Sequence, residues 1–301
     1  MAENKQSTPA PIMAPIMPDE GRIGRIGFQG VPGAYSHMAC QARLPDWEAV
    51  PFSSFEDMLA ATASGETDLA MVPVENSLAG RVADIHHLLP SSGLHIIGEH
   101  FQRVNHHLLG VAGSRLDSLR EVHSHAQGLA QCRATLRRHG LKPVMHPDTA
   151  GAAADIAAAG DMTVGAIASR LASQIYGLDI LIENAEDAEH NTTRMLLMTR
   201  QPLIPPVDSG AAITTLIFEC RSVPAALYKS LGGFATNGIN LTKLESYMLG
   251  GNFSAARFYV DAEGHVESQA FHHALEELRF YCPPESVRIL GCYPADPARQ
   301  R

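Results

Sequence analysis

Short apolar segments alternate with helical segments from residue 22 to about residue 200, and this alternation constrains the fold more than any other feature of the chain. A strand–helix–strand connection places consecutive strands parallel in one sheet, so the pattern predicts mainly parallel sheets with helices on both faces. The pattern restarts after two long connecting strands, expected at 95–101 and 106–111. We therefore expect two similar α/β lobes joined by a hinge.

Two helices carry recognisable signals at both ends. Ser54-Phe55-Glu56-Asp57 has the form of a capping box, and Gly65 is placed to end the helix that it opens. Asp148 is expected to cap an alanine-rich helix that ends at Gly160. A third helix is expected to run from Gln127 to His139.

The element order changes after a proline-rich linker at 201–210. Strands are expected at 212–220, 239–247, 253–260 and 287–292, and helices at 223–236 and 266–281. This β-α-β-β-α-β order is that of a ferredoxin-like module. The chain is thus divided into a disordered tail (1–21), a two-lobe domain (22–200), the linker, and a C-terminal domain (211–293).

Bulk composition excludes several classes of protein. A net charge of −9 with no basic block argues against nucleic-acid binding. Five widely spaced cysteines without a C-x-x-C pair indicate reduced thiols rather than disulfides or zinc ligands. The N-terminal segment lacks a signal-peptide core, and no apolar run approaches the ~20 residues that span a bilayer. We expect a cytoplasmic protein.

The segment after the strand at 69–72 has the polar composition of an anion site. Asn76 and Ser77 follow the strand's carboxyl end, and a helix is expected to start near Gly80. Ligands bind at such strand ends in open α/β sheets, and helix N-termini attract anions. The alternative is that Asn76 and Ser77 only cap the turn, and both roles are compatible.

Four collinear motifs together resemble prephenate dehydratase over about residues 22–292. They are Gly27-Phe28-Gln29-Gly30 through Gly33-Ala34-Tyr35-Ser36, Val72 through Val82, Ser124-His125 through Gln131-Cys132, and Asn191-Thr192-Thr193-Arg194. The resemblance implies a catalytic domain built like a periplasmic binding protein, with the site in its cleft. It also implies that the C-terminal module is an ACT domain that senses phenylalanine.

The implied reaction converts prephenate to phenylpyruvate, carbon dioxide and water. The departing ring carboxylate supplies the electrons, so we expect no base, nucleophile, metal or redox cofactor. Hydrogen-bond donors and one or two fixed cations suffice to hold the dianion and to help hydroxide leave. The chain has 15 histidines, several of them adjacent, but no H-E-x-x-H motif or Cys/His cluster that indicates a metal site.

The resemblance assigns the central roles to one motif. Thr193 is expected to lie nearest the leaving hydroxyl, and Arg194 to offer its planar fork to a carboxylate. The alternative is that Thr192 and Thr193 merely begin a strand and that Arg194 is a surface charge. Met195 stands where the family usually has Phe, so we expect altered packing around Arg194.

The second motif supplies further candidates. Asn76 and Ser77 are expected to donate to substrate oxygens, and Glu75 to orient neighbouring donors. Gly80 is expected to permit a close approach of the backbone.

The remaining candidates lie at the starts of two helices. Gln127 and Gln131 share a helix face at i, i+4, and we favour Gln131 as the one that reaches the cleft. His125 is expected either to donate to substrate or to cap its turn. Tyr35 and Ser36 open the first helix and are likewise expected either to donate to the substrate or to cap that helix.

The C-terminal domain matches the family's effector-binding motifs. A bound amino acid needs an apolar pocket and partners for its ammonium and carboxylate groups. The candidates are Leu227, Asn237, Gly238, Ile239, Asn240, Leu241, Thr242, Glu245 and Ser246. The alternative for Leu227 and Leu241 is a purely structural role in the core. The family's Glu-Ser-Arg-Pro is here Glu245-Ser246-Tyr247-Met248, which leaves the effector's identity and the strength of inhibition open.

These observations predict a monofunctional prephenate dehydratase of phenylalanine biosynthesis, inhibited by phenylalanine and assembled as a homodimer or homotetramer. Its partners are small molecules, with no nucleic acid and no membrane. Arogenate dehydratase is the nearest alternative, because arogenate differs only in an ammonium beside the side-chain carboxylate. A non-catalytic two-lobe sensor is the alternative from another class.

Overall fold

A computed structural model describes residues 22–220, 223–249 and 252–300. The chain divides into two compact units, each described by itself. One joins His86–Glu99 with Leu196–Arg301, and the other joins Glu20–Ile85 with His100–Met195. Within the described residues, no helix is long and apolar enough to cross a bilayer.

The first sheet has the strand order β2-β1-β3-β11-β5, and a short strand β4 pairs with β3. Strand β1 is parallel to both β2 and β3. The strands are β1 (Arg25–Gln29), β2 (Glu48–Phe52), β3 (Leu69–Asn76), β4 (Gly80–Arg81), β5 (His95–Arg103) and β11 (Thr192–Thr199). The helices of this part are α1 (Tyr35–Arg43), α2 (Phe55–Ser64), α3 (Ala83–Leu88) and the 3₁₀ turn η2 (Leu89–Ser91).

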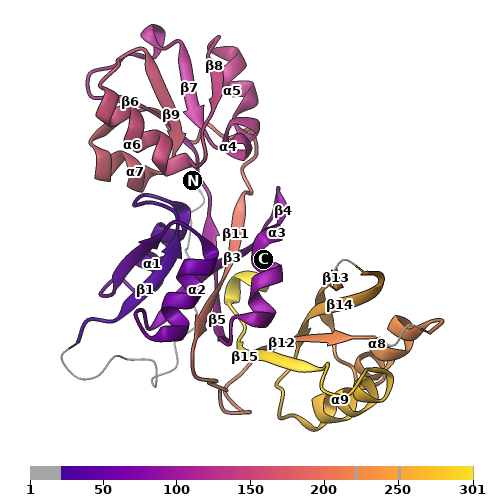
Figure 1. Cartoon of the computed structure of the whole chain (residues 1–301). Coiled ribbons are helices and arrows are strands. Elements are labelled where there is room, and N and C mark those ends of the chain that lie inside the picture. Colours follow the sequence, from indigo (N-terminus) through magenta and orange to yellow (C-terminus); the bar gives the residue numbers. More distant parts are fainter. Residues whose placement is uncertain (1–21, 221–222, 250–251, 301) are drawn as a thin grey trace. The chain divides into compact units, whose positions relative to one another are not determined.

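The second sheet has the order β10-β6-β9-β7-β8 and forms the second lobe (Figure 1). Its strands are β6 (His107–Val111), β7 (Glu121–Ser124), β8 (Lys142–Met145), β9 (Val164–Ala168) and β10 (Leu178–Ile182). Its helices are α4 (Ala126–Gln131), α5 (Arg133–Arg138), α6 (Thr149–Ala159), α7 (Arg170–Tyr176) and the 3₁₀ turn η3 (Leu116–Ser118).

Two α/β lobes are therefore present as predicted, but their sheets are mixed rather than mainly parallel. Strand β7 is parallel to β8 and β9, whereas β6 is antiparallel to both β9 and β10. The alternation of strands and helices did not reveal this, because β6 enters the second sheet from β5, which belongs to the first sheet, and not from a helix of its own lobe.

The predicted helix caps are confirmed. The Ser54 hydroxyl accepts a hydrogen bond from the Asp57 backbone N–H at 3.0 Å, and Asp148 caps α6 in the same way. Gly65 and Gly160 end their helices in the left-handed conformation, with φ of 90° and 67°. The helix predicted over 127–139 is instead interrupted at Cys132, which separates α4 from α5.

The helix predicted near Gly80 does not begin there, which corrects the expected helix N-terminus beside Asn76. Strand β3 continues to Asn76 and turns back as β4, so that Asn76 pairs with Gly80 in a tight hairpin. The Asn76 Oδ1 accepts the backbone N–H groups of Leu78 and Ala79 at 3.0 and 2.9 Å. This side-chain turn satisfies the backbone locally, and α3 starts only at Ala83.

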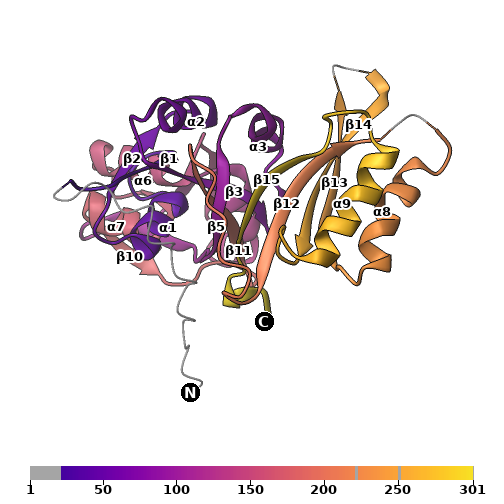
Figure 2. The same cartoon turned by 90° about the horizontal axis from the view of Figure 1, so that it is seen from below.

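The C-terminal module has the predicted ferredoxin-like order. The elements are β12 (Ala212–Glu219), α8 (Ala226–Thr236), β13 (Leu241–Leu249), β14 (Asn252–Glu263), α9 (Gln269–Tyr281), β15 (Arg288–Pro294) and the 3₁₀ turn η4 (Pro297–Gln300). The sheet order is β13-β14-β12-β15, with antiparallel neighbours. Helices α8 and α9 cover one face (Figure 2), and Phe218, Phe234 and Phe271 fill the core between them.

The opposite face of this sheet packs on residues 86–99 of the same unit. Arg288 donates from Nη1 to the Pro90 carbonyl at 2.9 Å, and the rings of His87 and Tyr247 meet edge to face at 5.8 Å. A Cβ at Gly291 would collide with the backbone carbonyl of Ile96. Residues 86–99 and the module therefore form one packed body, which explains why they belong to the same unit.

A buried ion pair holds this contact. The Glu99 side chain on β5 is fully buried and accepts from Nη2 of Arg299 at 2.8 Å. Glu99 also accepts the Asp296 backbone N–H at 3.0 Å, and Arg299 donates from Nη1 to the Thr242 hydroxyl at 3.2 Å. A carboxylate without water must be paired and hydrogen-bonded, and Arg299 supplies most of that compensation.

We predict that Arg299→Ala lowers the free energy of unfolding of this unit by about 3–5 kcal/mol, because it leaves the Glu99 carboxylate buried and unpaired. Urea denaturation followed by circular dichroism measures the change. The double variant Glu99→Gln/Arg299→Met should recover part of the loss. Arg115→Ala is the control, since the Arg115–Asp117 pair is exposed and its removal should leave the urea midpoint unchanged.

Candidate functional site

Asn76 lies at the centre of the candidate site, at the end of β3. Its Nδ2 donates to the Asn191 Oδ1 at 2.7 Å and to the Thr193 Oγ1 at 3.0 Å. Its Oδ1 is occupied by the two backbone N–H groups of the hairpin. Because backbone N–H groups only donate, the orientation of this amide is fixed by the hairpin.

The same network continues into the second lobe. Asn191 is fully buried, and its Nδ2 donates to the Gln131 Oε1 on α4 at 2.9 Å. That oxygen also lies 2.7 Å from Nε2 of His106. The structure therefore brings three predicted residues, Asn76, Thr193 and Gln131, into one hydrogen-bonded cluster.

The polarity of this cluster leaves two donors for a ligand. The Thr193 oxygen accepts from Asn76, so its own hydrogen is directed elsewhere. The Gln131 oxygen accepts from Asn191 and His106, so its Nε2 faces away from both. Over the described ranges neither the Thr193 hydroxyl hydrogen nor the Gln131 Nε2 has a protein acceptor within hydrogen-bond distance. The arrangement suits a ligand rich in oxygen atoms.

Arg194 is buried, with 4% of its surface exposed, and donates from Nη1 to the Glu75 Oε1 at 2.9 Å. The interpretation of Arg194 as a surface charge is therefore wrong, although Thr192 does begin strand β11. Met195 follows as a core residue with 1% exposure. The ion pair fixes the guanidinium plane and offsets its charge, in agreement with the expectation that Glu75 orients neighbouring donors.

Ser77 and Gly80 stabilise the hairpin. The Ser77 hydroxyl donates to the His190 carbonyl at 2.8 Å and accepts the Thr192 backbone N–H at 3.0 Å, which ties the hairpin to β11. Gly80 has a φ of +80°, and a Cβ there would meet no atom within 4 Å. The turn conformation, rather than the expected close approach, is what requires glycine in this structure.

Tyr35 supports the cluster from α1. Its hydroxyl lies 2.9 Å from the Asn105 carbonyl and 2.8 Å from Nδ1 of His106. Burial raises the pKa of this hydroxyl well above its usual value, and the charges of Cys132 and Glu186 add to the shift. Ser36 is buried in the same helix.

The remaining candidates on α4 lie outside the cluster. His125 caps the helix, because its Nδ1 accepts the Gln127 backbone N–H at 3.3 Å. The Gln127 side chain is exposed, whereas Gln131, one turn later, is half-buried and bonded. The preference for Gln131 over Gln127 agrees with this placement.

Sequence reasoning missed two side chains of the cluster. Asn191 belongs to a motif that was used, but no role was assigned to it. His106 was noted only as one of several adjacent histidines, and its backbone N–H is held by the Glu186 carboxylate at 2.8 Å. Its proximity to Gln131 depends on how β6 meets α4, and no local pattern encodes that.

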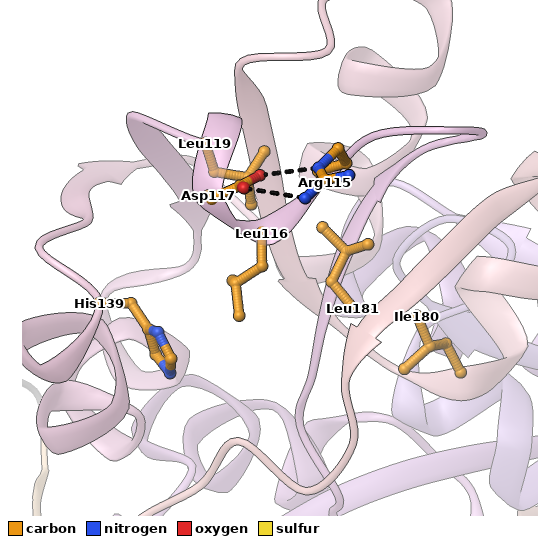
Figure 3. Close-up of a pocket in the computed structure, with 7 residues that line it drawn as sticks. All are labelled: Arg115, Leu116, Asp117, Leu119, His139, Ile180 and Leu181. Carbon is orange, nitrogen blue, oxygen red and sulfur yellow. Dashed lines mark hydrogen bonds and ion pairs between the residues drawn. The ribbon is translucent and has the colours of Figure 1, made fainter.

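A cavity of about 580 Å³ lies elsewhere on the second lobe (Figure 3). It is lined by Arg115, Leu116, Asp117, Leu119, His139, Ile180 and Leu181. None of the predicted site residues lines it. Over the part of the chain that the structure describes, no three or more His, Cys, Asp or Glu side chains gather in a way that could hold a metal ion.

The predicted effector residues lie around β13 and the end of α8. Leu227, Ile239 and Leu241 pack on the core of the module, so the structural role that was weighed for Leu227 and Leu241 is present. Asn237 ends α8 and donates to the Gly233 carbonyl at 2.8 Å, and Gly238 has a φ of +69°.

The polar members of the effector set contact charged partners. Asn240 donates to Glu263 at 3.1 Å, and Glu245 pairs with Lys243 at 3.1 Å. Thr242 and Ser246 are exposed. Their roles in binding an effector stay predictions.

Comparison with known proteins gives one consistent family. The family description "Prephenate dehydratase" matches residues 26–203. A bifunctional N-acyl-homoserine lactone acylase/prephenate dehydratase of Komagataeibacter europaeus is 50% identical over 276 residues, 92% of this chain and 98% of that protein. An arogenate dehydratase/prephenate dehydratase 1 of Arabidopsis thaliana is 39% identical, covering 93% of this chain and 74% of that protein.

A solved structure agrees with this result. The prephenate dehydratase of Arthrobacter aurescens, in complex with L-Phe, superposes with a TM-score of 0.82 at 28% identity and covers 90% of each chain. The predicted fold class, a two-lobe body like a periplasmic binding protein followed by a ferredoxin-like module, is confirmed.

We predict that His106 is neutral at pH 7 with its proton on Nε2. The Gln131 oxygen requires a donor there, and the single Tyr35 hydrogen is then shared between the unprotonated Nδ1 and the Asn105 carbonyl. Burial lowers the pKa of His106 below the ordinary histidine value of 6.5, against smaller opposite effects of Gln131 and Glu186. Nitrogen-15 NMR of the imidazole, assigned with a His106→Gln variant, measures both properties.

This shift also has a thermodynamic consequence. Because the folded-state pKa is depressed, the stabilisation by neutral His106 is present above about pH 6.5 and is lost as the pH falls through the folded-state pKa. A proton resident on Nδ1 at pH 7, or a pKa above 6.5, would contradict the assigned polarity of the network.

Proposed function

The chain belongs to the prephenate dehydratase family, and we propose that the Asn76–Thr193–Gln131 cluster carries out the decarboxylative dehydration of prephenate. In this reaction the bond between the ring and its carboxylate breaks and releases carbon dioxide. Its electron pair moves into the ring, and the C4–OH bond breaks to release hydroxide. Hydroxide takes one proton and leaves as water, and phenylpyruvate remains.

The observation that carries this proposal is the contact between Asn76 and Thr193. Because Asn76 donates to the Thr193 oxygen, the hydroxyl hydrogen remains for the leaving hydroxyl of the substrate. A threonine hydroxyl is too weak an acid to give up its proton outright, so it acts as a hydrogen-bond donor while solvent supplies the net proton. A preorganised donor of this kind stabilises charge where it develops in the transition state.

The substrate is a dianion, and the donors fit its oxygens. The Gln131 Nε2 is assigned to a substrate carboxylate. The Arg194 guanidinium is assigned to the other carboxylate, with Glu75 holding its plane. Six further candidates are assigned to shaping the rim of the site. They are Tyr35, Ser36, Ser77, Gly80, His125 and Gln127.

We predict that Thr193→Ala lowers kcat by more than tenfold, within the roughly 10²–10⁴-fold typical of a placed donor. The assay measures phenylpyruvate by its absorbance in base. Thr192→Ala is the matched control, because the neighbouring side chain of a strand points to the opposite face. Full activity of a correctly folded Thr193→Ala variant would remove Thr193 from its role.

The C-terminal module is proposed to be an ACT domain that binds L-phenylalanine and regulates the catalytic lobes. The support is its β-α-β-β-α-β order, its motif residues and the L-Phe complex of the Arthrobacter relative. Phenylalanine bound between the modules of paired subunits would favour one arrangement of the lobes. A homodimer or homotetramer in the cytoplasm is the proposed setting.

We predict that phenylalanine lowers prephenate turnover and shifts the size-exclusion profile of the full chain. Tyrosine serves as the control ligand, because its hydroxyl must be accommodated in a pocket built for an apolar ring. Phenylalanine that changes neither turnover nor elution would refute regulation through this module.

Two further substrates belong in the same assay. Arogenate differs by an ammonium group, and the ratio of kcat/KM values for arogenate and prephenate decides between these two substrates.

The bifunctional relative adds a second candidate activity, N-acyl-homoserine lactone acylase. This chain is 50% identical to that relative over 98% of its length, which is the reason to assay the acylase activity as well. Release of free fatty acid measures this activity, and Thr193→Ala shows whether the two reactions share a site.

A further inference from the structure

We propose that Asn191 is a positioning residue that sets the direction in which the donors of both lobes face. The inference rests on the proposed function. Asn191 is fully buried, so its role is not to touch the substrate. It joins Asn76, on the hairpin of the first lobe, to Gln131, on α4 of the second.

The direction of the network follows from the backbone. Two hairpin N–H groups occupy the Asn76 Oδ1, so Nδ2 of Asn76 must donate. The Asn191 Oδ1 therefore accepts, and its Nδ2 donates to the Gln131 oxygen. The Gln131 Nε2 is thereby turned away from Asn191. Among the described residues, Asn191 is the amide that is bonded both to Asn76 on the hairpin and to Gln131 on the other lobe, so the direction of its two hydrogen bonds connects them.

The backbone of Asn191 is held independently of its side chain. Its carbonyl accepts the Val104 N–H at 2.9 Å, just beyond the end of β5. A change of the side chain therefore alters the hydrogen-bond pattern without releasing the chain. This separation makes Asn191 a suitable position for an isosteric substitution.

Asn191→Asp tests the inference, because an ionised carboxylate accepts on both oxygens. It still accepts from Asn76, but it no longer donates to Gln131. The Gln131 amide is then expected to flip while the His106 proton moves from Nε2 to Nδ1, where the Tyr35 oxygen accepts it. The flip places the Gln131 oxygen where the substrate carboxylate binds. A protonated carboxyl group donates again and restores the original pattern.

The expected result is therefore a loss of catalytic activity that depends on pH. The kcat of Asn191→Asp, divided by that of the wild type, should fall at least tenfold as the pH rises through the pKa of the introduced carboxyl group. The KM should rise over the same pH range, because the flipped Gln131 amide turns an oxygen instead of an N–H group toward the substrate carboxylate. Asn191→Ala should lower kcat by a similar factor with a ratio that is constant with pH.

Other titratable groups surround the network and also affect both profiles, which is why the ratio to wild type is measured. The groups are Tyr35 on α1, Glu75 on β3, His106 before β6, Cys132 after α4, Glu186 and Asp187 in the loop before β11, and Arg194 on β11. Gln174→Glu is the control for added charge, since Gln174 is exposed on α7 of the same lobe. Its ratio to wild type should stay near one at every pH.

Two outcomes overturn the inference. One is a kcat of Asn191→Asp that stays close to the wild-type kcat at every pH. The other is a kcat of Asn191→Asp that is low relative to the wild type by a factor that does not vary with pH, as is expected for Asn191→Ala. If Asn191→Asp fails to fold by circular dichroism, Gln131→Glu replaces it, because it removes the same Nε2 donor and should show the same loss with rising pH. Wild-type protein that makes no phenylpyruvate contradicts the proposed function itself, whereas active wild type with a flat ratio contradicts only the role of Asn191.

Discussion

The site depends on one side-chain amide that makes five hydrogen bonds. Asn76 accepts two backbone N–H groups of its own hairpin and donates to Asn191, Thr193 and, at 3.4 Å, the Thr192 carbonyl. No residue that only donates or only accepts can replace it, because both functions are used at once. A rigid backbone turn thus fixes the hydrogen positions of side chains that lie more than a hundred residues later in the chain.

Electrostatics explains why the proposed site relies mainly on neutral hydrogen-bond donors to stabilise the transition state. The chain has a net charge of −9, and the buried Arg194 is already paired with Glu75. A strong field of positive charge would hold substrate and product anions alike. Oriented N–H and O–H groups instead act at short range on the atoms where charge develops, so they favour the transition state over the ground state.

The sequence predicted the parts of this structure that short segments encode. Ser54 and Asp148 cap their helices as expected, since a cap involves only neighbouring residues. The hairpin at Gly80 was read as a helix start, because Asn and Ser favour both kinds of turn. The roles of Asn191 and His106 were not predicted, because their hydrogen bonds depend on how two lobes meet.

Strand β5 contributes to both compact units. Near its middle, Glu99 is paired with Arg299, which also contacts Thr242 on β13. Just after its end, the Val104 N–H holds the Asn191 carbonyl. The two compact units divide this strand between Glu99 and His100, so each part of it serves its own unit. Glu99 ties β5 to the C-terminal module, and Val104 fixes the backbone of Asn191 beside the proposed donors.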